Sequence, residues 1–183
     1  MDKSSALSFE GQAFYFGIDV HKKQWTLTVR SENMELKKFV APPDAVKLRE
    51  FANHHYPGGV YYSVYEAGFR GFSVHRALTA VGFHNIVVHP PDIPHTDQEK
   101  RRKNDARDSR KLARELANGS LKPLFVPSPE EEALRALCRE RAAFVRDAVR
   151  TKNRIKAILR LMGVPSADRQ LGTAMVRRFY QVP

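Results

Sequence analysis

The first part of the chain alternates short apolar segments with polar connections. Residues 13–20 (AFYFGIDV) are apolar, aromatic and β-branched, which is typical of a buried strand. Residues 25–30 alternate apolar and polar side chains, and residues 35–40 repeat this pattern more weakly. Because the connections between these three segments are short, the pattern predicts an antiparallel meander of three strands.

Helical and strand-like segments then alternate. Pro42-Pro43-Asp44 opens a predicted helix that ends at Pro57-Gly58-Gly59. The apolar side of this helix is expected to hold Val46, Leu48, Phe51 and Ala52. Residues 60–65 predict a strand that ends at Glu66, residues 69–81 a helix, and residues 84–89 a further strand. A polar and basic loop follows over residues 90–104, then a helix over residues 105–118 and a short strand over residues 124–126.

The last large element begins at Ser128. Ser128 and Glu131 fit a capping box with Pro129 at the first helical position, and no Gly or Pro follows until Gly163. This predicts one helix of about 35 residues, with a heptad-like apolar stripe. The stripe consists of Leu137, Phe144, Ala148, Ile155, Ile158 and Met162. A small domain cannot bury such a long stripe, so we expect the helix to pair with another helix, in the same chain or a second copy. An amphipathic helix that folds back on the domain is the alternative.

Three antiparallel strands followed by alternating helices and strands give the element order of a ribonuclease-H-like mixed sheet. We therefore expect an α/β fold with flanking helices over residues 1–127. A long coiled-coil-type helix is expected over residues 128–163, and a tail over residues 164–183.

Composition narrows the class of protein. With 183 residues, 42% hydrophobic and 28% charged, the chain can form one ordinary domain, or a smaller domain with an extension. The single cysteine, Cys138, excludes an intramolecular disulfide and a zinc site built from cysteines, and favours a reducing, intracellular setting. No apolar run approaches the ~18 residues that a bilayer span needs, so we expect no membrane partner.

The basic excess is local. Lys and Arg total 31 against 20 Asp and Glu, a net charge of +11. Residues 100–114 hold eight basic and two acidic residues, net +6, and residues 135–160 hold nine and two, net +7. The rest of the chain therefore carries 11 − 13 = −2. Two basic stretches on a near-neutral body favour a polyanionic partner, with a pair of solvated helices as the alternative.

Four acidic residues fall where the ends of predicted elements would bring them together. Asp19 lies within an apolar strand, where an acid is costly unless it is paired or bound to metal. Glu66 ends a strand that could lie beside the first, and Asp105 and Asp108 share one face at the start of a helix. Such hard oxygen ligands suit Mg²⁺ or Mn²⁺, and two ions about 4 Å apart support phosphodiester chemistry. The alternative is structural, with helix-capping acids and a glutamate paired to arginine. His21 could approach the same site, or be an ordinary surface histidine.

Several motifs at these positions resemble the DEDD transposases of the IS110 insertion-sequence family. The motifs are Gly17-Ile18-Asp19-Val20-His21-Lys22, Tyr65-Glu66-Ala67-Gly68, Lys103-Asn104-Asp105-Ala106-Arg107-Asp108 with Leu112-Ala113, and residues 150–163. Each motif is short, but their order and spacing together are specific. The sequence departs from the family at Asn104, where Thr is usual, and at Ser109, where Ala is frequent. Neither departure removes a carboxylate.

The resemblance implies a RuvC-like, ribonuclease-H-like domain whose catalytic acids Asp19, Glu66, Asp105 and Asp108 bind two Mg²⁺ or Mn²⁺ ions. It implies a recombinase that moves an insertion element between DNA sites, guided by an element-encoded bridge RNA. The long helix would be the coiled-coil segment of a homodimer or larger assembly. The setting would be the prokaryotic cytoplasm, with association to the nucleoid during action.

Basic residues beside the predicted acids and in the long helix are the expected nucleic-acid contacts, because they can neutralise phosphates. These residues are Lys100, Arg101, Arg102, Lys103, Arg107, Arg110, Lys111, Arg150, Lys152, Arg154 and Lys156.

Family members continue into a second domain that supplies a serine nucleophile, and this chain stops at Pro183. We therefore expect either an N-terminal fragment or a truncated element, which does not complete strand exchange alone. Two other functions stay open at this point. One is a junction-resolving nuclease with the same fold and metal site. The other is a non-catalytic module for nucleic-acid binding and dimerisation, in which the acids are structural.

Overall fold

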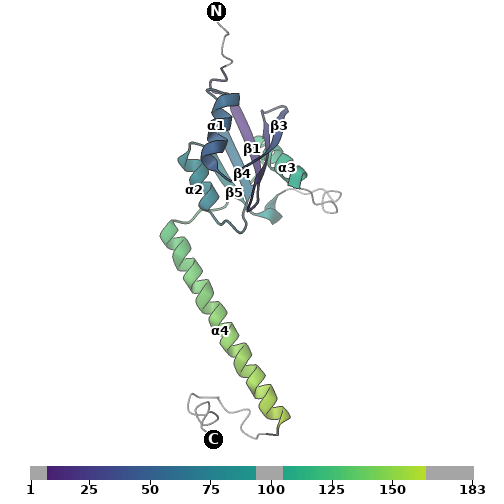
Figure 1. Ribbon diagram of the computed structural model, residues 1–183, viewed down its shortest axis with the longest axis vertical. Coiled ribbons are helices and arrows are strands. Elements are labelled where there is room, and N and C mark those ends of the chain that lie inside the picture. The colour runs from purple at the N-terminus through teal and green to yellow at the C-terminus, as the bar shows by residue number, and fades with distance from the viewer. Residues whose placement is uncertain (1–7, 94–104, 164–183) are drawn as a thin grey trace, which may run out of the picture. The chain divides into compact units, whose positions relative to one another are not determined.

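A computed structural model describes residues 8–93 and 105–163, with side chains from residue 108 onward in the second segment. The chain divides into two compact units, Met1–Val126 and Pro127–Pro183. The first is a mixed α/β unit around a five-stranded sheet, and the second contains one long helix (Figure 1). The expected α/β class with a long C-terminal helix is confirmed.

The sheet has the strand order β3-β2-β1-β4-β5. β1 (Ala13–Val20), β2 (Trp25–Arg30) and β3 (Glu35–Ala41) form the predicted antiparallel meander. β4 (Val60–Glu66) pairs in parallel with β1 on its other side, and β5 (His84–Val88) pairs in parallel with β4. β1 is therefore the central strand, which explains why its sequence is apolar almost throughout.

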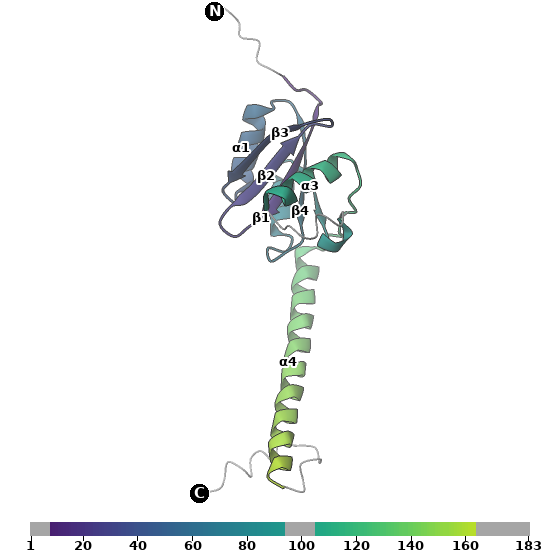
Figure 2. The same cartoon turned by 90° about the vertical axis from the view of Figure 1, so that its right-hand side faces the viewer.

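Helices cover both faces of this sheet. α1 (Ala45–His55) and α2 (Ser73–Ala80) lie on one face, and α3 (Asp105–Ala117) crosses the other over β1, β2 and β4 (Figures 1 and 2). Because successive strand residues point to opposite faces, alternate β1 residues serve different layers. Phe16 and its neighbours two residues away in β1 are buried in the core under α1 and α2. The residues between them, including Gly17, face α3.

The start of α1 agrees with the sequence, but its apolar side needs one correction. Asp44 caps the helix, and its Oδ1 accepts hydrogen bonds from the backbone N–H of Val46 at 2.8 Å and of Lys47 at 3.2 Å. Val46 was expected to face the core, yet it is 56% exposed. The buried positions are Ala45, Leu48 and Ala52, whose spacing of three and four residues leaves the side chain at 46 pointing outward.

α2 begins four residues later than predicted. Residues 69–72 form turns, and Gly71 adopts a positive φ of 55°, which interrupts a right-handed helix. The hydroxyl of Tyr65 donates to the Gly71 carbonyl at 3.0 Å and accepts from the His75 N–H at 3.2 Å. This side chain therefore orders the helix start from the neighbouring strand. Phe69, which the sequence placed inside the helix, is 67% exposed.

The strand predicted over residues 124–126 is absent from the described structure. Pro123, just before these residues, forms an isolated β-bridge with Val88 of β5. The Leu124 N–H donates to the Val87 carbonyl at 2.7 Å. Pro123 and Pro127 have no N–H, so the pairing cannot extend in either direction. A 3₁₀ turn also occupies Pro90–Asp92, at the start of the predicted loop.

α4 (Pro129–Leu161) is one continuous helix, as the sequence predicted. The capping box is complete: the Glu131 N–H donates to Ser128 Oγ at 3.2 Å, and the Ser128 N–H donates to Glu131 Oε2 at 2.9 Å. Three acidic residues follow in the first turn, which suits the helix dipole. Among the described residues, no helix combines the length and the apolar character that a membrane crossing requires.

Candidate functional site

Two carboxylates lie side by side at one end of the sheet. Ile18 of β1 pairs in parallel register with Tyr65 of β4, so the next residues, Asp19 and Glu66, are neighbours at the carboxyl ends of the two strands. Their side chains point to the face that α3 covers, because Gly17 and Val64, two residues earlier, face α3. Both acids are half-buried. The register thus creates a pair of acids on the face of the sheet that carries α3.

The approach of α3 to this face depends on a glycine. A Cβ on Gly17 would lie 2.0 Å from the carbonyl oxygen of Ser109 and 2.4 Å from the backbone nitrogen of Ala113. The Oγ atoms of Ser109 and Thr28 are hydrogen bonded at 3.0 Å, and both side chains are buried. The first half of α3 is therefore held directly against β1 and β2. Asp108, immediately before Ser109, is half-buried in this turn.

His21 contacts the first of these acids. Its Nε2 lies 2.9 Å from Oδ2 of Asp19, and the two side chains are 43% and 21% exposed. A tight turn, with the His21 N–H donating to the Gln24 carbonyl at 3.2 Å, brings the imidazole back toward the strand end. The histidine is thus a direct neighbour of the candidate site.

Phe69 and Arg70, in the loop that follows β4, form a basic and aromatic rim that the sequence had not indicated. Arg70 donates from Nη2 to the Lys22 carbonyl at 3.2 Å, which joins the loop after β1 to the loop after β4. Its guanidinium carbon is 5.6 Å from the ring centroid of the exposed Phe69. The sequence signal for this loop is Gly68-Phe69-Arg70-Gly71, which begins two residues after Glu66, since glycines on both sides of a short segment favour a loop.

The carboxylate oxygens of Asp19, Glu66 and Asp108 are the kind of ligand that a hard divalent cation prefers. The described side chains nevertheless supply only part of a metal site. Among them, no group of three or more His, Cys, Asp or Glu could hold a metal ion. Asp105 is the first residue of α3, and its side chain lies outside the described part. The structure brings Asp19 and Glu66 together and places Asp108 in the adjoining helix turn, while the contribution of Asp105 stays a prediction.

Some predicted nucleic-acid contacts lie outside the described residues: Lys100, Arg101, Arg102 and Lys103, and the side chain of Arg107. Arg110 is engaged within the protein. Its Nη2 lies 2.9 Å from Glu35 Oε1 and its Nε 2.6 Å from Glu35 Oε2, and this hydrogen bonding raises the pKa of Arg110. Lys111 is half-buried. In α4, Arg150, Lys152 and Arg154 are exposed and Lys156 is half-buried.

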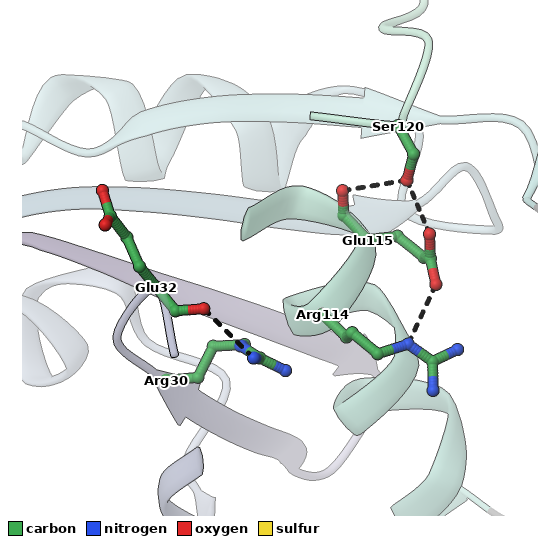
Figure 3. A network of polar contacts seen from close by, with 5 residues as sticks. All are labelled: Arg30, Glu32, Arg114, Glu115 and Ser120. Carbon is green, nitrogen blue, oxygen red and sulfur yellow. Dashed lines mark hydrogen bonds and ion pairs between the residues drawn. The ribbon is translucent and has the colours of Figure 1, made fainter. Parts of the chain in front are cut away.

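The far end of α3 is held by a separate polar network (Figure 3). Glu115, which is 8% exposed, accepts hydrogen bonds from Arg114 Nε at 3.0 Å and from Ser120 Oγ at 2.6 Å. On β2, Arg30 donates from Nη2 to the Glu32 carbonyl at 3.3 Å. The Glu115 contacts therefore stabilise the C-terminal end of α3 from within residues 114–120, and the Arg30 contact stabilises the loop after β2.

Residues 16–163 match the family profile of the IS110 DEDD transposases, a family described as transposase. The chain belongs to the IS110 transposase family. The matched region contains the four acids of the sequence prediction and all of α4. The resemblance stated from the motifs is confirmed.

Named relatives of this IS110-family chain are also transposases. It is 33% identical over 180 residues to transposase y4rJ of Sinorhizobium fredii, which covers 87% of this chain and 45% of the relative. It is 29% identical over 149 residues to the transposase for insertion sequence element IS1533 of Leptospira borgpetersenii, covering 79% and 43%. A second Sinorhizobium fredii transposase, y4qE, is 35% identical over 98 residues, covering 54% and 25%. The chain thus spans less than half the length of these relatives.

Proposed function

We propose that this chain is the metal-binding part of an IS110 transposase that acts on DNA. In this proposal Asp19, Glu66, Asp105 and Asp108 bind two Mg²⁺ or Mn²⁺ ions. The observation that carries the proposal is the parallel pairing of β1 with β4, which sets Asp19 beside Glu66 on the sheet face that carries α3, the helix that begins at Asp105. Half-buried acids placed side by side repel one another, and a divalent cation relieves that repulsion.

The topology supports a RuvC-like, ribonuclease-H-like fold. The order β3-β2-β1-β4-β5, with β2 antiparallel to both of its neighbours and β4 and β5 parallel to β1, is the arrangement expected of such a sheet. On this proposal residues 1–127 form the RuvC-like domain and residues 128–163 the dimerisation segment. Residues 164–183 then lead toward the second domain of the family.

The protein's own residues would hold the reacting strand as well as the metal. When bound, divalent ions polarise the phosphate and stabilise the oxygen that leaves. His21 contacts one carboxylate oxygen of Asp19 and so restricts how this acid can turn. Arg70 is placed to neutralise a phosphate at the rim, and Phe69 offers an exposed ring on which a base can stack.

Two further partners complete the proposal. The apolar stripe of α4 pairs with a second copy of the chain, giving a homodimer or a larger assembly. A guide RNA joins the DNA as a nucleic-acid partner, which rests on the family resemblance and on the net charge of +11. In a cell, such a protein associates with the nucleoid.

The metal site is tested by thermal melting during a Mn²⁺ titration. A ligand that binds only the folded state raises the melting temperature, by several degrees when its concentration is about 100 times Kd. We expect this saturable rise in the wild-type chain and not in Asp19→Asn. Asp147→Asn is the matched control, because it removes an exposed acid of α4 and should keep the full rise. Equal shifts in wild type and Asp19→Asn would show that Mn²⁺ binds elsewhere.

A non-catalytic nucleic-acid-binding module is the second candidate function. It is favoured by the exposed Arg150, Lys152 and Arg154 of α4, which can bind phosphate without a metal ion. The two candidates differ when nucleic acid is added to the same titration. If Mn²⁺ leaves the melting temperature unchanged both with and without DNA, the acids are structural and this candidate replaces the first.

A further inference from the structure

The long helix α4 has one apolar face. With Leu134 at heptad position a, positions a and d form a seam along the helix. Its apolar members are Leu134, Leu137, Phe144, Ala148, Ile155, Ile158 and Met162. Leu137, Phe144 and Ile158 are 67%, 70% and 57% exposed, so large side chains of the seam are open to a partner.

The opposite face of α4 is basic. Heptad positions b, c and f point away from the seam, and between residues 135 and 160 none of them is acidic. We define the outer face by its basic residues, which are Arg135, Arg139, Arg146, Arg150, Lys156 and Arg160. Alanine occupies positions 136, 142, 143 and 157 among them, with Val149 and Asn153 at the remaining two.

The acids of this stretch lie beside the seam instead. Glu140 and Asp147 are both at position g, next to the apolar residues. A helix that only needed to be soluble would mix both signs of charge over its outer surface. The separation therefore produces a positive strip that faces away from any helix paired at the seam.

The dimensions of the strip suit a nucleic-acid backbone. At 1.5 Å per residue, Arg135 and Arg160 are roughly 37 Å apart along the axis, a little more than one turn of duplex DNA. The small alanine side chains between the arginines allow the helix to approach a phosphate strand closely. Arg150 contacts Asp147 at 3.2 Å, but both side chains are about two-thirds exposed, so a phosphate can compete for this arginine.

We infer that the outer face of α4 binds the phosphate backbone of double-stranded DNA without sequence preference, while the seam pairs with a second helix. The inference rests on the proposed function, since duplex DNA is the substrate of a transposase. The inference also separates the four basic residues of α4 predicted from the sequence as nucleic-acid contacts into two groups. Arg150 and Lys156 lie on the outer face, whereas Lys152 at position e and Arg154 at position g flank the seam.

The test compares two double variants of the full chain that remove the same charge from the same helix. Arg139→Gln with Arg146→Gln neutralises the outer face, and Lys152→Gln with Arg154→Gln neutralises the flank of the seam. Fluorescence anisotropy with a labelled duplex DNA of arbitrary sequence measures the binding constant across a series of salt concentrations. Circular dichroism verifies that both variants keep their helix content.

Each phosphate contact contributes about 0.9 to the slope of log K against log salt concentration. We expect the outer-face variant to lose about 2 in this slope and the flank variant to keep the wild-type value. Equal losses in the two variants would overturn the inference, because binding would then follow net charge alone. Outer-face dependence seen with duplex RNA but not with duplex DNA would overturn the assignment to DNA. The Mn²⁺ melt of the same variants reports separately on the metal proposal.

Discussion

Gly17 determines how closely α3 can lie on the sheet. The nearest atoms that a Cβ at this position would meet are the carbonyl oxygen of Ser109 and the amide nitrogen of Ala113, both in the backbone of α3. Neither atom can move without moving the helix. Asp105 and Asp108 belong to the same helix. This one glycine therefore determines how close the backbone of these two candidate ligands lies to the strand that carries Asp19.

We predict that Gly17→Ala destabilises the fold by about 3 kcal/mol, the upper end of ordinary overpacking costs, because α3 must be displaced. Urea unfolding measures the change. Gly68→Ala is the control, since its added Cβ meets only one atom, at 3.8 Å, and the backbone there has no positive φ. A cost below 1 kcal/mol for Gly17→Ala would show that the helix can shift freely on the sheet.

Single residues differ in how far the sequence reveals them. Asp19 could be singled out because an acid among apolar strand residues needs a partner. Thr28 and Ser109 could not be paired in advance, because they are far apart in the chain and hydroxyl groups are common at the surface. Phe69 was expected to begin a helix over residues 69–81, but Gly71 adopts a positive φ and the helix begins only at Ser73.

At the scale of elements, α3 is fixed by hydrogen bonds as well as by packing. The pair formed by Thr28 and Ser109 links β2 to the turn of α3 that follows Asp108. Because both hydroxyls are buried, removing one of them leaves the other without its partner in the core.

We predict that Thr28→Val and Ser109→Ala each cost about 1 kcal/mol of unfolding free energy, and that the double variant costs less than their sum. The expected coupling is about 1 kcal/mol, measured by urea unfolding of all four proteins in the cycle. Strict additivity would mean that the two hydroxyls do not depend on each other.

Elements with strong local signals were predictable. The meander followed from its alternation of apolar residues, and α4 from its capping box and the lack of Gly and Pro. The start of α2 was not, because the Tyr65 hydroxyl that orders it comes from a different element. The short strand at 124–126 failed because two prolines remove the donors that a ladder requires.

At the scale of the whole molecule, self-association should depend on the seam of α4. We predict that Phe144→Ser weakens association of the chain at least tenfold, because a large aromatic side chain is lost from position d. Val149→Ser is the control, since this valine is also an exposed apolar residue of α4 but lies at position b, away from the seam. Sedimentation velocity over a range of concentrations measures both. Unchanged association of Phe144→Ser would exclude the seam as the contact.

The sequence predicted the layout of the molecule better than the geometry of its site. Alternating elements indicated the mixed sheet, and charge counting located both basic stretches. The register that puts Asp19 beside Glu66 depends on parallel pairing between two strands that share no tight turn, so turn geometry does not fix it as it does in a hairpin. The division of α4 into a seam and an outer face was present in the sequence, but it emerges only when charges are assigned to heptad positions.

The packing of α3 on β1 has a consequence for folding during protein synthesis. Asp108 leaves the ribosome 89 residues after Asp19, an interval of roughly 5–20 s at ordinary translation rates of about 5–20 residues per second. During that time one face of the central strand has no covering helix. Long-range contacts of this kind also slow refolding. A chain stalled before α3 has left the ribosome therefore presents one uncovered face of the sheet to chaperones.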